Sequence, residues 1–127
     1  MKSLTRYIQE KLVIKKSASK NYKYFPETKE ELRDIIERRI KKEGNNVDLN
    51  DIDVSKITDM SKLFKRSNFN GDISNWDVSR VKDMSYMFKD SNFNGDISDW
   101  DVSNVKNMHN MFKYSPLEGN EPDWYRD

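Results

Sequence analysis

The chain has 127 residues, the usual length of one domain, and it carries no cysteine. The lack of cysteine excludes a disulfide framework, a thiolate zinc site and a cysteine nucleophile. Charged residues make up 35% of the chain, but the formal net charge is only +1. This balance argues against a bulk electrostatic attraction to nucleic acid or to an anionic membrane.

Residues 1–26 begin with a weak amphipathic pattern. The spacing of Leu4, Tyr7, Ile8 and Leu12 predicts a short helix, and residues 15–26 are typical of a loop. Charged side chains interrupt residues 1–14, so we expect no secretory signal peptide. The sequence contains no run of about 18 apolar residues, so we expect no membrane span. We therefore expect a protein of the bacterial host cytoplasm, without a membrane partner.

Basic and aromatic side chains are interleaved in residues 11–24. Lysines can contact a phosphate backbone and tyrosines can stack on bases, so this segment is a candidate nucleic-acid site. Its residues are Lys11, Lys15, Lys16, Lys20, Tyr22 and Tyr24. No net basic field supports the segment, so nucleic-acid binding is an alternative and a solvated loop is the default interpretation.

Residues 28–43 carry the clearest helix signal. Thr28 and Glu31 form a capping box, and apolar residues from Leu32 to Ile40 mark one helix face. Lysines suit the negative C-terminal end of the helix, and Gly44 can end it. We expect residues 1–46 to form a helical cap on the rest of the chain.

The remainder of the chain is a tandem 24-residue repeat. Residues 71–94 and 95–118 share 15 of 24 positions, and residues 47–70 share 13 of 24 with residues 71–94. Residues 119–127 keep the phase and form a partial unit. One repeating unit cannot bury its apolar face alone, so successive units should stack on one another. We expect one folded domain, with Trp124 covering the last core layer.

Each unit combines two patterns. The segment from Ile73 to Val78 suits a short strand, and the segment from Ser79 to about Lys89 has apolar residues at helical spacing with Ser79 as the N-cap. The Asn-Gly steps between units can supply positive φ. The predicted fold is an α/β repeat: a short leucine-rich-repeat-like solenoid of three units plus a C-terminal partial unit, capped by the N-terminal helical segment.

A long string recurs in residues 69–112, and it resembles the BspA-type repeat of bacterial surface proteins and mycoplasma lipoproteins. The string is F-N-G-D-I-S-x-W-D-V-S-x-V-x-x-M-x-x-M-F, at Phe69–Phe88 and again at Phe93–Phe112. The resemblance covers about residues 47–118 and fits a compact stand-alone version of the family. It implies a leucine-rich-repeat-like fold, adhesion or protein binding without catalysis, and core roles for the motif residues.

The recurring polar and aromatic residues favour structural roles. The aspartates fit turn and cap hydrogen bonds, because residues 48–59 lack the glycine and the glutamate of a calcium loop. The tryptophans and methionines fit a core spine. His109 is the only histidine, and we expect it on the surface. No cofactor or catalytic fingerprint occurs, so we expect no catalytic residue, cofactor or metal.

Two phases of the repeat vary from unit to unit. If the residues that recur in every unit form the scaffold, the residues that vary should determine which partner is bound. Tyr and Arg are also enriched at binding hot spots. The predicted partner-binding residues are Lys62, Arg66, Tyr86, Asp90, Asn110 and Tyr114. For any single position, ordinary surface drift explains the variation as well.

These observations favour a non-catalytic protein–protein interaction module with a protein partner. A phage or mobile-element inhibitor or adaptor that acts on a host protein is the specific form that we expect. Two alternatives stay open: a structural, assembly or surface-adhesion component, and a nucleic-acid-binding protein that uses residues 11–24.

Overall fold

The computed structural model describes residues 21–127, and its one α-helix in that range is α2 (Lys29–Glu43). The Thr28 hydroxyl accepts a hydrogen bond from the Glu31 N–H at 3.1 Å. At the other end, Gly44 has φ 95° and its N–H donates to the Ile40 carbonyl at 2.8 Å. The helix predicted over residues 28–43 is confirmed. The helix predicted around Leu4–Leu12 lies outside the described residues.

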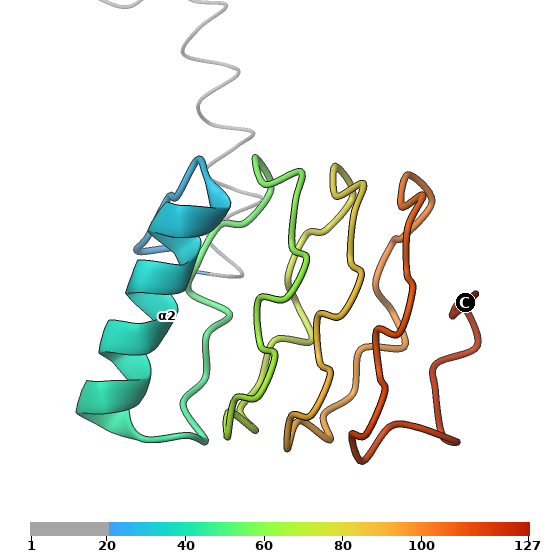
Figure 1. Cartoon of the computed structure of the whole chain (residues 1–127). Coiled ribbons are helices and arrows are strands. Elements are labelled where there is room, and N and C mark those ends of the chain that lie inside the picture. The colour runs from blue at the N-terminus through green and yellow to red at the C-terminus, as the bar shows by residue number, and fades with distance from the viewer. Residues whose placement is uncertain (1–20) are drawn as a thin grey trace, which may run out of the picture.

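Helix α2 packs along the first of a row of stacked coils (Figure 1). Leu32 and Ile36 are buried against them. Polar contacts fix the helix at both ends: Lys29 pairs with Asp59 at 3.2 Å, and Arg39 binds Asp51 at 2.8 Å. One end of the apolar interior is thereby covered.

The predicted α/β repeat solenoid is wrong. Within residues 44–127 the structure has neither an α-helix nor a regular strand, and no sheet forms. In the described residues, strand-like pairing is limited to isolated parallel bridges, which join Asp59 to Asp83, Asp83 to Asn107 and Tyr24 to Ile52. Each 24-residue unit is instead one coil of turns and irregular backbone, stacked on the next coil (Figure 1).

Consecutive turns replace the predicted helix in each unit. The Met87 N–H donates to Met84 and the Ser91 N–H to Phe88, so each turn closes over four residues. The third residue of each turn binds the next coil: the Tyr86 N–H donates to the His109 carbonyl at 2.9 Å, and the Asp90 N–H donates to the Lys113 carbonyl at 2.9 Å. Apolar residues at a four-residue spacing resemble the 3.6-residue period of a helix, which explains the error.

The turns also change the roles expected for two residue types. Ser79 is not a helix N-cap; its N–H donates to the Asp77 carboxylate at 3.1 Å. Gly71 and Gly95 do not adopt positive φ. Gly71 is needed for space, because an added Cβ would lie 1.8 Å from the Val47 carbonyl oxygen.

Aromatic rings stacked from coil to coil form the core. The rings of Phe64, Phe88 and Phe112 lie 5.5 and 5.7 Å apart and are nearly parallel. Trp76 and Trp100 are buried and stacked, and Trp124 continues the row at 6.2 Å. Each indole N–H donates to a carbonyl of the preceding coil. The core role of the tryptophans is confirmed, and so is that of the methionines: Met60, Met84, Met87, Met108 and Met111 are buried.

Candidate interaction surface

The six predicted partner-binding residues share an unusual backbone conformation. All of them have positive φ, between 52° and 61°, although none is glycine. In the described residues, the one other non-glycine residue with positive φ is Asn21. The six are Lys62, Arg66, Tyr86, Asp90, Asn110 and Tyr114. Two of the rows that vary in the repeat are therefore strained positions of the coils, whereas a third variable row, Lys56, Arg80 and Asn104, does not have positive φ.

The two turns of each unit impose this conformation. Tyr86 is the third residue of the turn Met84–Met87, and Asp90 is the third residue of the turn Phe88–Ser91. A third residue with positive φ favours glycine or asparagine. Other residues cost roughly 1–2 kcal/mol there, because the Cβ approaches the backbone. Among the six, only Asn110 and Asp90 are residue types that visit this conformation readily.

The two tyrosines lie beneath lysine side chains. Lys62 and Lys65 place their ammonium groups 6.0 and 5.8 Å from the centre of the Tyr86 ring. Lys89 and Lys113 lie 5.8 and 5.0 Å from the Tyr114 ring. Each such contact contributes about 0.5–1 kcal/mol at an exposed site. Tyr114 is 63% exposed, so much of its side chain remains accessible.

One row of this surface was missed in the sequence. Lys65, Lys89 and Lys113 occupy the same phase of the three units, between the two variable rows. Burial lowers the pKa of Lys65, and the charges of Lys89, Arg66 and Lys62 lower it further. The signal was available, because a lysine that recurs unchanged is not explained by a hydrophobic core. We call the six variable residues and the three lysines the turn face.

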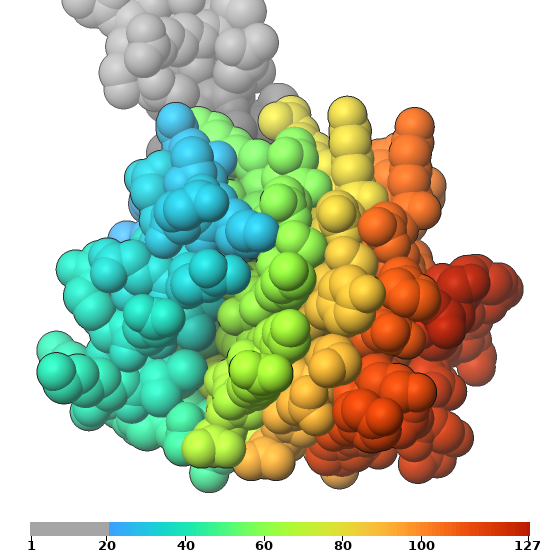
Figure 2. All heavy atoms as spheres, in the orientation of Figure 1, coloured from blue at the N-terminus to red at the C-terminus, as the bar shows by residue number. Residues whose placement is uncertain are grey.

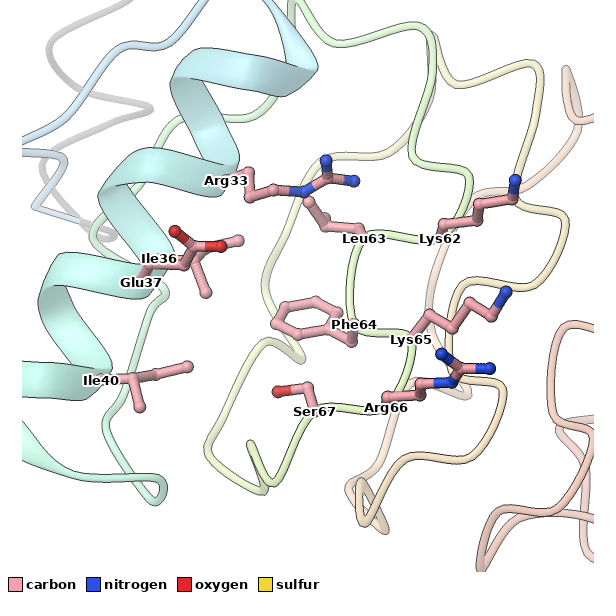
Figure 3. A pocket seen from close by; sticks show the side chains of 10 residues that line it. All are labelled: Arg33, Ile36, Glu37, Ile40, Lys62, Leu63, Phe64, Lys65, Arg66 and Ser67. Carbon is pink, nitrogen blue, oxygen red and sulfur yellow. The ribbon is translucent and has the colours of Figure 1, made fainter.

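A groove adjoins the turn face between α2 and the first coil. It has a volume of about 540 Å³, and Figure 3 shows the side chains that line it. Ile36 and Ile40 of α2 point toward the coil, where Leu63 and Phe64 face them (Figure 3). The cationic lining residues are Arg33, Lys62, Lys65 and Arg66. The groove therefore combines apolar walls with a cationic rim.

The stack is closed at its C-terminal end by carboxylates. In the inner coils, backbone N–H groups of the turns donate to the next coil, but the third coil has only the partial unit beside it. Asp127 accepts from the Asn110 N–H at 3.3 Å, and Glu118 accepts from the Tyr114 N–H at 3.2 Å. Trp124 covers the last aromatic layer, as predicted.

The aspartates of the repeat hold turns, which confirms the role expected for them. Asp72 accepts from the Ser74 N–H at 2.9 Å, and Asp96 and Asp101 repeat this contact with Ser98 and Ser103. The hydrogen bonds from Ser74 hold the pKa of Asp72 below its usual value. Within residues 21–127, no three potential metal ligands form a cluster.

The predicted nucleic-acid segment is only partly described. Lys11, Lys15, Lys16 and Lys20 lie outside the described residues. Tyr24 packs on the core, with the Arg39 guanidinium 5.2 Å from its ring. Tyr22 contacts Phe25 edge to face. Of the two aromatic side chains assigned to base stacking, Tyr24 is thus already used in packing.

His109 lies on the surface, as predicted. Its Nδ1 is 3.4 Å from Asp127, and its ring meets the Tyr86 ring edge to face at 5.5 Å.

The space-filling view shows the three coils as adjacent bands on one face of the molecule (Figure 2).

Comparison with protein families identifies the repeat. The model of the family described as "Mycoplasma protein of unknown function, DUF285" matches residues 32–124. The chain belongs to this family. DUF285 proteins are related to BspA-type mycoplasma repeat proteins, which confirms the resemblance at the family level. No curated protein and no solved structure shows significant similarity to this DUF285 chain.

The described part of the DUF285 chain, residues 21–127, holds no helix long and apolar enough to cross a membrane. The cytoplasmic location stays a prediction.

Proposed function

We propose that this DUF285 chain is a compact, non-catalytic protein-interaction module that binds its partner through the turn face. The observation that supports this proposal is that two variable rows of the repeat lie at strained positions: all six residues of these rows have positive φ without being glycine. Glycine would relieve this strain. Strain that persists in a folded protein is typical of functional sites.

The chemistry of the turn face suits a protein partner. Tyrosine and arginine supply much of the binding energy in protein interfaces, and both occur in these rows, at Arg66, Tyr86 and Tyr114. The backbone that carries them is held by hydrogen bonds between coils, so little conformational entropy is lost when they bind. An inhibitor or adaptor from a phage or mobile element, acting in the host cytoplasm, is the specific form that we propose.

Affinity capture from host cells tests the proposal. The Tyr86→Ala/Tyr114→Ala variant should lose a protein that the wild-type chain retains. A matched control is Tyr22→Ala/Phe25→Ala, which also removes one partly buried ring and one ring that is 63% exposed. Thermal unfolding of both variants establishes that they fold. Capture of the same proteins by wild type and by the folded turn-face variant would refute the proposal.

A further inference from the structure

The charges of this nearly neutral chain are unevenly distributed at the turn face and its groove. The formal net charge of the whole chain is +1. Around the groove, the cationic side chains of Arg33, Lys62, Lys65 and Arg66 accompany one carboxylate, that of Glu37. Along the lysine row, Lys89 pairs with Asp90, and Lys113 lines a small pocket with Glu118, Glu121 and Asp127. The surplus of positive charge therefore lies at the groove.

Few of these cations are neutralised within the protein. Lys89 pairs with Asp90 at 3.2 Å. Lys62, Lys65 and Lys113 lie over tyrosine rings, which attract a cation without cancelling its charge. The neighbouring like charges also lower the pKa of Lys65. An added anion would relieve this repulsion.

The groove supplies a second and different contact. Ile36, Ile40, Leu63 and Phe64 line it beside the cationic rim (Figure 3). Ile36, Leu63 and Phe64 are at most 7% exposed, and Ile40 is only partly buried. An apolar side chain of a ligand can therefore contact Ile40 while carboxylates of the same ligand reach the lysines. Such a ligand is acidic and carries an apolar residue.

We infer that the groove and the lysine row Lys65–Lys89–Lys113 bind an acidic peptide segment of the protein partner, with one apolar side chain of that segment in the groove. This inference rests on the proposed function and names the chemistry of the partner. A nucleic acid fits less well, because its phosphates have no use for the apolar residues that line the groove, and lysines already contact the tyrosine rings on which bases would stack.

A defined probe tests the inference without knowledge of the natural partner. The probe is a fluorescein-labelled peptide of glutamates around a central leucine. A glutamine counterpart and a single-stranded oligothymidylate of equal length are compared with it by fluorescence anisotropy on the full chain. The glutamate peptide should bind most tightly, and its binding should weaken as salt rises from about 0.05 M to about 0.5 M.

Two lysine variants with the same change of charge locate the site. Lys65→Gln/Lys89→Gln/Lys113→Gln should weaken binding of the glutamate peptide about tenfold, since each exposed ion pair contributes little alone. Lys42→Gln/Lys82→Gln/Lys106→Gln removes three exposed lysines elsewhere and should leave binding unchanged. Thermal unfolding establishes that both variants fold.

Other results would overturn the inference: equal binding of the glutamine peptide, tighter binding of the oligothymidylate, no binding, or equal losses in both lysine variants. The two proposals fail separately. If capture from cells depends on Tyr86 and Tyr114 but the glutamate peptide does not bind, the interaction face stands and its acidic ligand is wrong. If the peptide binds as expected but capture is unaffected, the anion site stands and the proposed function is wrong.

Discussion

The inward and outward sides of the coils share one backbone but differ in how strictly their residues recur. On the inward side, Phe64, Phe88 and Phe112 stack with nearly parallel planes. On the outward side, Lys62, Tyr86 and Asn110 occupy equivalent positions with φ near 60°. Because the backbone requirement is the same in all three coils, it does not explain the outward differences. The repeated residues fix the stack, and the outward rows are free to specify a partner.

The largest loss of stability should come from a substitution on the inward side of the coils. Phe88→Ala removes the middle ring of the phenylalanine row, which is fully buried. We expect a loss of about 3–5 kcal/mol in the free energy of unfolding, from lost burial and the cavity that remains. Urea denaturation measures it. A loss below about 1 kcal/mol would show that the ring row does not hold the stack.

The close approach between coils gives the next prediction. Gly71→Ala should destabilise the protein by about 1–3 kcal/mol, because the new Cβ meets the rigid Val47 carbonyl at 1.8 Å. Gly95→Ala is the matched control, since its Cβ meets the Phe93 ring at 2.7 Å, and a ring can shift. Thermal unfolding compares the two variants. Equal losses would contradict the difference between the two contacts.

Substitution by glycine on the outward side should raise the free energy of unfolding, whereas the two changes above should lower it. Lys62→Gly and Arg66→Gly relieve positive φ at exposed positions, so each should stabilise the protein by about 0.5–1 kcal/mol after the entropy of the unfolded chain is counted. Arg80→Gly, at an exposed residue without positive φ, should instead destabilise it by about 0.5–1 kcal/mol. Urea denaturation measures these changes. A change of the same sign in the free energy of unfolding at all three positions would argue against strain on the turn face.

The smallest expected effect is the dependence of the free energy of unfolding on pH. Burial raises the pKa of Asp59, but hydrogen bonds from Ser61 and the Lys29 ammonium together outweigh it, so this pKa stays below its usual value. Hydrogen bonds from Ser74 likewise lower the pKa of Asp72. A lowered folded-state pKa gives stability that is present above the unfolded-state pKa of about 3.9 and is lost as the pH falls through the folded-state pKa. Solvent screening limits the contribution to about 0.5 kcal/mol for each group.

Asparagine substitutions test this pH dependence while the turns are kept. Asn107 already accepts from the His109 N–H in the same way as the aspartates. Asp59→Asn/Asp72→Asn should therefore fold and should lose less stability than the wild type below about pH 4. Identical pH profiles in urea denaturation would contradict the assigned pKa directions.

Structure that depends on interactions between residues close in the sequence could be predicted, whereas structure that depends on distant residues could not. Helix α2 was predicted because its caps, Thr28 and Gly44, act within a few residues. The coils were not, because their hydrogen bonds join residues 23 positions apart, such as Tyr86 and His109. Turns of four residues place apolar side chains almost where a helix would. Recurrence alone was enough to predict the tryptophan row.

The turn face was predicted in part for a similar reason. Variation between units indicated six outward residues, and their positions do not depend on whether the backbone is a helix or a series of turns. Their positive φ could not be inferred, because only Asn110 and Asp90 are residue types that tolerate it. The lysine row was overlooked because recurrence was equated with a core role, although Lys65, Lys89 and Lys113 are only partly buried.

The central claim is that the outward rows serve binding and not folding. Capture of host proteins by Tyr86→Gly/Tyr114→Gly tests it most directly, because glycine removes both side chains and also relieves the backbone strain at φ 58° and 59°. We expect a folded variant that no longer captures the partner of the wild-type chain. Undiminished capture of that partner by the folded variant would contradict it.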